Sequence, residues 1–309
     1  MSPLGALKFI FERHISNLDN WAINTKVLIV FHRALQNIKV NRKIYKDLKS
    51  KEHLLHPYQN KKAEMNYNIK MYTEISKQYS NYIKFYLNIA NKTDILAKSM
   101  QKISDDVAAL RTADILKHYE YFEALVTQIF ALFQHANFCR QTRLFSNLIF
   151  MLFKDLIKIY KVYYVHITEI LERFPSLSSS DAQKAFVMYQ NFVNLTDSIK
   201  TKANKLIYLF NFPIQLPDFY NPEKGLVETL QVVMEQAKAG DKSGMIDMSK
   251  KLRGGMNRDQ FGGVQSTTAK KTNNNDDGDK EYYFDCNILD KLDTNQAQQP
   301  AFEEAKGDN

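Results

Sequence analysis

Residues 145–174 read FSNLIFMLFKDLIKIYKVYYVHITEILERF, and this stretch decides the fold. Its apolar side chains recur every three or four residues, which is the period of an α-helix; they are Leu148, Leu152, Leu156, Tyr160, Tyr163, Ile167, Ile170, Leu171 and Phe174. The stripe continues for about eight turns and is wide enough to face several neighbours. We therefore predict a long central helix of a helical bundle or solenoid, which ends at Pro175.

The same period continues on both sides of this helix. It runs from Trp21 to Leu35, and again from Ala182 to Thr196 after a capping box that we assign to Ser180 and Gln183. Residues 1–239 contain only two glycines and no proline between Pro57 and Pro175, whereas sandwiches, barrels and doubly wound sheets need frequent turn residues. Residues 1–239 are thus predicted to form one all-α domain.

Residues 240–309 differ in composition. They are rich in Gly, Asn, Asp and Gln and offer too little apolar surface to offset the entropy of ordering. From Thr272 onward the segment has 3 basic and 10 acidic residues. We predict a disordered acidic tail, interrupted by one apolar island that begins at Tyr282.

The residues give little support for an enzyme. Two cysteines cannot build a disulfide framework, no secretory segment or membrane-spanning run is found, and a reducing cytosolic location follows as the default. No paired carboxylates, nucleophile elbow or set of four metal ligands is found, so we predict no catalytic residue, no metal and no cofactor. Cys139 lies in a Phe-rich stretch and is interpreted as a buried structural residue. The protein is predicted to bind rather than to catalyse.

Positive charge concentrates at the start of the chain. Residues 1–70 contain 13 basic and 5 acidic side chains. Lys39, Arg42, Lys43 and Lys46 stand at i, i+3, i+4 and i+7, which places four cations on one helix face. This basic stripe suits an anionic membrane leaflet, a phosphoinositide headgroup or nucleic acid, and a solvated helix face remains the alternative. Nucleic acid is disfavoured because the aromatic residues follow the helix-core period instead of clustering among the cations.

Three stretches, in order and spacing, resemble the ANTH domain of clathrin-assembly proteins. The first is Phe11-Glu12-Arg13, then Trp21 and a lysine-led helix over 26–35 that contains His32. The second runs from Asn147 through Phe153-Lys154-Asp155 to Phe174, and on to Met188-Tyr189-Gln-Asn-Phe192. The third is Ile214-Gln-Leu216-Pro217-Asp218, followed by Pro222 and Leu226 to Leu230. Together they cover most of residues 9–236.

The resemblance implies an all-α, right-handed superhelical solenoid. It also implies a peripheral adaptor of clathrin-mediated endocytosis that binds phosphatidylinositol 4,5-bisphosphate at the plasma membrane, in clathrin-coated pits and vesicles. The implied partners are clathrin and an adaptor complex, which a disordered tail engages, and in some members SNARE cargo. A helical scaffold with protein partners alone is the alternative.

The sequence departs from the family at the lipid site, which is a lysine-rich motif ending in lysine–histidine within the first two helices. Those helices should precede Phe11 and are not found, so no family lipid-binding residue is assigned. Either the sequence is truncated, or the site is lost, or the basic stripe has replaced it. In the tail, Leu289-Asp290-Lys291-Leu292-Asp293 resembles a clathrin box, with Leu289, Leu292 and Asp293 as its candidate coat-binding residues.

Overall fold

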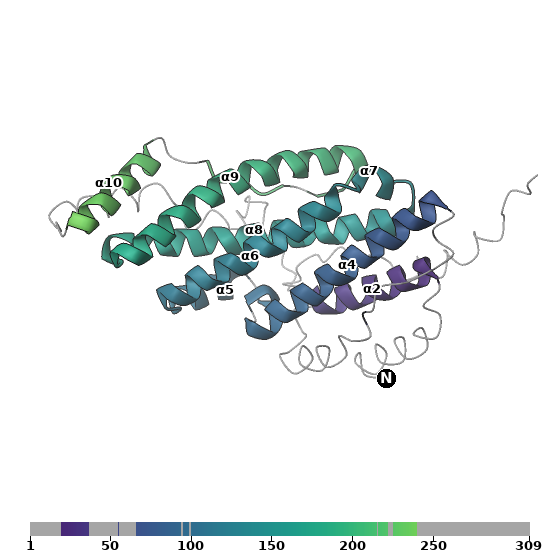
Figure 1. The fold of residues 1–309 in the computed structure, drawn as a ribbon, viewed down its shortest axis with the longest axis horizontal. Helices are drawn as coiled ribbons and strands as arrows, with labels where there is room; N and C mark the ends of the chain where they lie inside the picture. Colours follow the sequence, from purple (N-terminus) through teal and green to yellow (C-terminus); the bar gives the residue numbers. More distant parts are fainter. Residues whose placement is uncertain are drawn as a thin grey trace, which may run out of the picture. The chain divides into compact units, whose positions relative to one another are not determined.

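The computed structural model describes residues 20–36, 55, 66–93, 95–98, 100–214, 216–221 and 225–239. The chain divides into two compact units, Met1–Val264 and Gln265–Asn309, and every described residue belongs to the first. Within these ranges the regular secondary structure is entirely helical (Figure 1). The predicted all-α class is therefore confirmed.

The helices follow one another with short connections. Their bounds are α2 (Trp21–Gln36), α4 (Tyr67–Lys92), η4 (Ile95–Ala97), α5 (Met100–Ala108), α6 (Thr112–Phe133), α7 (Ala136–Cys139), α8 (Arg143–Arg173), η5 (Phe174–Ser176), α9 (Ser179–Phe210) and α10 (Leu226–Ala239). None of the described helices combines the length and the apolarity that crossing a bilayer requires.

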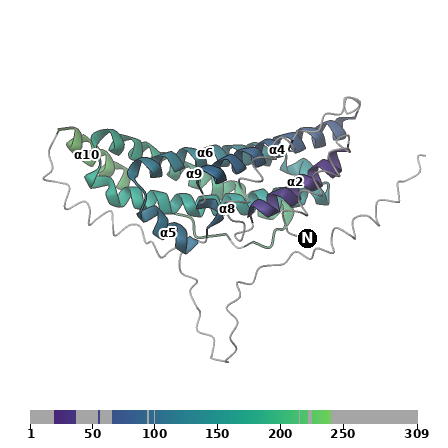
Figure 2. The ribbon, with the colours of Figure 1, turned by 90° about the horizontal axis from the view of Figure 1, so that it is seen from below.

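Helix α8 is the centre of this unit, as its sequence predicts. It packs against α2, α5, α6, α7 and α9, and two views at right angles show α6 and α9 running beside it (Figures 1 and 2). Its predicted stripe is buried throughout, from Leu148 at 0 % exposure to Leu171 at 2 %. A helix that is apolar on most of its circumference needs neighbours on most sides, which explains its central position.

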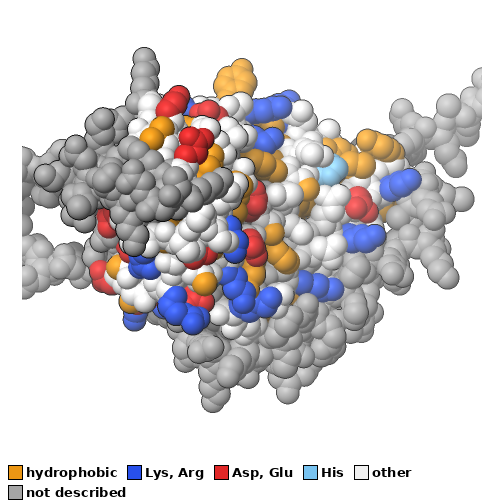
Figure 3. Space-filling view, turned by 60° about the vertical axis from the view of Figure 1, so that its left-hand side comes forward, with side chains coloured by type: hydrophobic (Ala, Val, Ile, Leu, Met, Phe, Trp, Pro, Cys, Tyr) orange, Lys and Arg blue, Asp and Glu red, His pale blue; other side chains and the backbone are white. Residues whose placement is uncertain are grey.

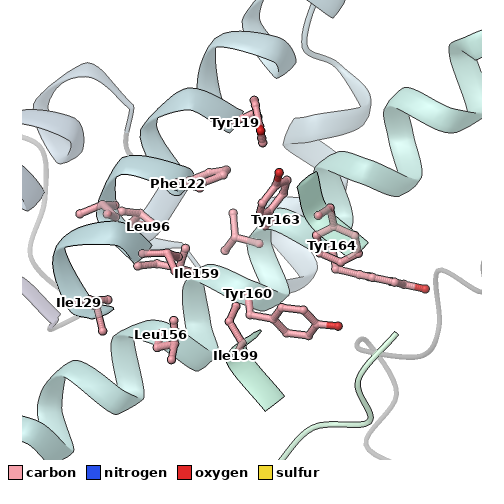
Figure 4. Close-up of a cluster of buried hydrophobic side chains, with 14 of the residues drawn as sticks. Leu96, Tyr119, Phe122, Ile129, Leu156, Ile159, Tyr160, Tyr163, Tyr164 and Ile199 are labelled. Carbon is pink, nitrogen blue, oxygen red and sulfur yellow. The ribbon is translucent and has the colours of Figure 1, made fainter. Parts of the chain in front are cut away.

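Tyrosines make up much of this core and bring their hydroxyl groups into it. Figure 4 shows Tyr119 and Tyr163 turned toward one another, while the hydroxyls of Tyr160 and Tyr164 point away from α6. The Tyr160 hydroxyl accepts a hydrogen bond from the backbone N–H of Tyr220 at 2.8 Å, and the Tyr189 and Tyr220 hydroxyls lie 3.1 Å apart. These bonds attach the segment 216–221 to α8 and α9.

The N-cap of helix α9 lies two residues before the predicted cap, Ser180. Its N-cap is Ser178, whose hydroxyl accepts a hydrogen bond from the backbone N–H of Asp181 and donates one to its carboxylate. The assignment of the cap to Ser180 and Gln183 was therefore wrong. Asp181 also places a negative charge in the first turn, where the helix dipole favours it.

Arg173, at the end of α8, holds the C-terminus of α5. Its guanidinium donates to the carbonyl oxygens of Leu110 at 2.5 Å and Ala108 at 2.8 Å, and it pairs with Glu169 at 2.7 Å. Carbonyls at a helix end have no partner within the helix. One side chain therefore satisfies the end of α5 and fixes that helix against α8.

We expect Arg173→Ala to lower the free energy of unfolding by about 2 kcal/mol, because hydrogen bonds from a charged donor are lost and carbonyls are left without it. Chemical denaturation measures the loss, and amide hydrogen exchange should quicken first in α5. Lys184→Ala, on the exposed surface of α9, is the matched control. Equal exchange in α5 of both variants would contradict the assigned role of Arg173.

Candidate functional site

The residues that the sequence singled out for binding lie outside the described residues. This holds for Lys39, Arg42, Lys43 and Lys46 of the basic stripe, and for Leu289, Leu292 and Asp293 of the tail. Their roles stay predictions. The described residues show instead what holds the body together and which groups its surface presents.

A buried polar network joins the first two stretches that carry the family resemblance. His32 of α2 and Asp155 of α8 stand 123 residues apart in sequence, and the His32 Nε2 lies 2.6 Å from the Asp155 Oδ2. Because a carboxylate only accepts, Nε2 carries the proton of this bond. The Tyr82 hydroxyl donates to the same oxygen at 2.5 Å, and the Gln36 amide donates to Oδ1 at 2.6 Å. Asp155 thus receives three donors from α2 and α4.

The network extends to Tyr79, whose hydroxyl lies 2.7 Å from the His32 Nδ1. His32 is 0 % and Asp155 is 3 % exposed. Burial alone would raise the pKa of Asp155, but the charge and hydrogen bond of His32 and the donors Tyr82 and Gln36 bring it below its usual value. Burial raises the pKa of Tyr79 and of Tyr82 well above that of a free tyrosine, and the Asp155 charge adds to this.

This arrangement fixes helices rather than catalysing a reaction. Both heteroatoms of the His32 ring and both oxygens of Asp155 are engaged with protein groups, and no substrate can reach them in the closed core. Sequence reasoning noticed His32 and Asp155 separately, as parts of two motifs. It missed their contact because period and spacing do not relate residues so distant in sequence.

We expect Asp155→Asn to cost about 3 kcal/mol of folding free energy, since an amide N–H would face donors inside a closed core. Urea denaturation measures the loss. Asp197→Asn, on an exposed part of α9, should change stability little. A cost for Asp155→Asn as small as that of the control would show that the network is dispensable.

A second polar contact links α6 to α8, between the half-buried His118 and the buried His166. The His166 Nδ1 lies 2.8 Å from the Val162 carbonyl oxygen, so Nδ1 carries the proton and Nε2 accepts. The His118 Nδ1 lies 3.2 Å from that Nε2 and is its donor. Burial lowers the pKa of His166 to about 3, against the opposing effect of the Val162 carbonyl. His166 is therefore neutral in the folded protein at physiological pH.

This burial predicts a loss of stability in mild acid. Between pH 6.5 and pH 3 the unfolded chain binds a proton at His166 that the folded chain does not, so the free energy of unfolding falls as pH decreases, by up to about 1.4 kcal/mol per pH unit. His166→Gln should flatten this dependence between pH 4 and pH 6.5. Denaturation curves over that range test it, and identical slopes for the wild type and the variant would contradict it.

Cys139 is buried and free, as predicted. Burial raises the pKa of its thiol to about 12, so the thiolate that a nucleophile needs does not form at neutral pH. The neighbouring Arg140 is exposed. Among the described residues no three His, Cys, Asp or Glu side chains converge as a metal site would require.

The charges of the described surface are largely paired around α5 and the start of α6. Lys98 contacts Asp106 at 2.7 Å, Arg111 contacts Asp114 at 2.8 Å, and Arg173 contacts Glu169. The face in Figure 3 accordingly shows basic and acidic side chains intermixed. Between α4 and α6 lies an open groove of about 680 Å³ with a polar lining that includes Gln78, Asn81, Glu120, Glu123 and Gln128.

The family model that matches the chain is that of the ANTH domain, over residues 8–201. The match includes His32, Asp155 and the whole of α8, and it covers more than half of the chain. No curated protein matches the chain at a significant level.

Proposed function

Because the chain belongs to the ANTH domain family, we propose that it is a peripheral membrane adaptor of clathrin-mediated endocytosis. In this function it binds a phosphoinositide-rich membrane and carries coat proteins to it. The observation that carries the proposal is the family match over residues 8–201. That range contains the basic stripe and the helices from α2 through most of α9.

The basic stripe is the membrane contact in this proposal. Lys39, Arg42, Lys43 and Lys46 would meet lipid phosphates, and each cation near an anionic bilayer contributes about 1 kcal/mol. Four cations give weak binding, so a second contact is needed. The tail would supply it through Leu289, Leu292 and Asp293, which would bind clathrin or an adaptor complex. Two weak contacts on one chain reinforce one another through effective concentration.

The described body supports a binding role. Its tyrosine-rich core and the His32–Asp155 network hold the helices in one arrangement, which is what an adaptor needs to present surfaces at fixed positions. The proposal also includes SNARE cargo as a partner. The proposed location is the cytoplasmic face of the plasma membrane, together with clathrin-coated pits and vesicles.

A helical scaffold that binds only proteins is the second candidate. One observation favours it: the groove between α4 and α6 is open and most of its lining residues are polar. A groove lined by carboxamides and carboxylates suits a protein partner better than an anionic membrane. Vesicle sedimentation separates the two candidates, because only the membrane adaptor binds anionic vesicles, and that binding weakens as ionic strength rises.

We expect the full chain to sediment with vesicles that contain phosphatidylinositol 4,5-bisphosphate, and less so as salt rises. Lys39→Glu with Lys43→Glu should weaken this binding by more than about 30-fold, since two contacts of about 1 kcal/mol each are lost and two repelling carboxylates are added. The control is Lys117→Glu with Lys184→Glu, two exposed lysines on α6 and α9. Full binding by the stripe variant would remove the stripe from the proposal, and no binding by the wild type would favour the scaffold.

A further inference from the structure

One part of the described surface carries positive charge with no acidic residue among it. It consists of the start of α4 (66–73), the residues around α7 (133–147) and the end of α9 (200–212), which we call the α7 tip. These elements lie together: Tyr67 meets Phe138 ring to ring at 6.5 Å, Phe133, Asn137 and Lys205 line one pocket, and Figure 1 shows α7 beside the end of α9.

The α7 tip has six cations and no Asp or Glu in its three ranges. The cations are Lys70, Arg140, Arg143, Lys200, Lys202 and Lys205. None of them takes part in an ion pair among the described residues, in contrast to Lys98, Arg111 and Arg173 near α5. Unpaired cations on one surface repel one another, so an anionic partner would stabilise this end of the body.

A small pocket lies at the centre of the α7 tip. It has a volume of about 200 Å³ and is lined by Phe133, Gln134, Ala136, Asn137, Lys202, Lys205 and Leu206. The Lys202 ammonium is held over the Phe130 ring at 4.8 Å from its centre, which positions one charge at the pocket. The lining thus includes two lysines and an asparagine among apolar residues, and such a set suits one phosphate group. The volume equals that of about seven waters, too little for a folded peptide segment.

Two tyrosines stand out from the α7 tip into solvent. Tyr208 is 91 % exposed and Tyr67 is 71 % exposed, whereas most tyrosines of this body are buried. Exposed large aromatic rings among cations are typical of surfaces that meet the headgroup layer of a bilayer, where the ring enters the interface and the hydroxyl stays hydrated.

We propose that the α7 tip is a second membrane contact, in which a lipid phosphate sits between Lys202 and Lys205 and the rings of Tyr208 and Tyr67 enter the headgroup layer. The contact rests on the proposed membrane function and adds to it a site apart in sequence from the basic stripe. A bilayer fits better than an acidic peptide, because the six cations come from three separate ranges of the chain and the pocket has room for one group only.

The test is vesicle binding by the full chain, with phosphatidylcholine vesicles that either contain or lack phosphatidylinositol 4,5-bisphosphate. Lys202→Glu with Lys205→Glu should weaken binding to the anionic vesicles by more than about 30-fold, since two cationic contacts of about 1 kcal/mol each are lost and two repelling carboxylates are added. Tyr208→Ser should weaken it several-fold, and this loss should persist at high salt because it is not electrostatic. Lys117→Glu with Lys184→Glu carries the same change of charge elsewhere and should retain most of the binding.

The outcomes distinguish the α7 tip as a membrane contact from the proposed adaptor function as a whole. If the wild type binds no anionic vesicles, the proposed function fails, and the α7 tip fails with it. If the wild type binds and the Lys202/Lys205 variant binds equally well, only the α7 tip is overturned. The α7 tip would also be overturned as a membrane contact if the Lys202/Lys205 variant lost binding to a poly-glutamate peptide and kept full vesicle binding. The partner of this surface would then be an acidic peptide. Thermal unfolding of Lys202→Gln with Lys205→Gln, expected to match that of the wild type, controls for folding while the charge is removed.

Discussion

The body depends on one constraint, which is the placement of a carboxylate in the middle of its central helix. Asp155 is almost fully buried, and an unpartnered charge there would cost far more than a folded domain can tolerate. Helices α2 and α4 supply hydrogen-bond donors to this carboxylate. His32 and Gln36 come from α2, and Tyr82 comes from α4. A shift of any of the three helices by one turn would remove a donor, so the polar network defines how they pack.

Much of the fold could be predicted from the sequence because it depends on local periods. Helix α8 was predicted from its stripe, and Trp21 and Pro175 mark the start of α2 and the end of α8 closely. The N-cap of α9 was not predicted correctly, because the run from Ser176 to Ser180 contains four serines. Only the local backbone conformation selects Ser178. The contact of His32 with Asp155 needs the folded chain, because nothing in either motif indicates its partner.

The two proposed binding surfaces also differ in whether the sequence alone reveals them. The basic stripe is visible in the sequence because its cations recur at helical spacing. The α7 tip is not, because its cations come from three distant ranges. One signal was available: no Asp or Glu occurs between Glu123 and Asp155, which is an unusual gap in a chain with 34 acidic residues. The gap indicates a basic surface only once the fold is known, because folding places it beside the end of α9, which also has no acidic residue.

The attachment of residues 216–221 has a consequence for how the body comes apart. The Tyr160 hydroxyl accepts from the backbone of Tyr220, and the Tyr189 hydroxyl lies against that of Tyr220. If a protease cut the chain between α9 and α10, these phenol groups would lose their partner and water would enter between α8 and α9. Cleavage beside this segment would therefore weaken the packing of residues 216–221 on α8 and α9 and leave the His32–Asp155 contact in place.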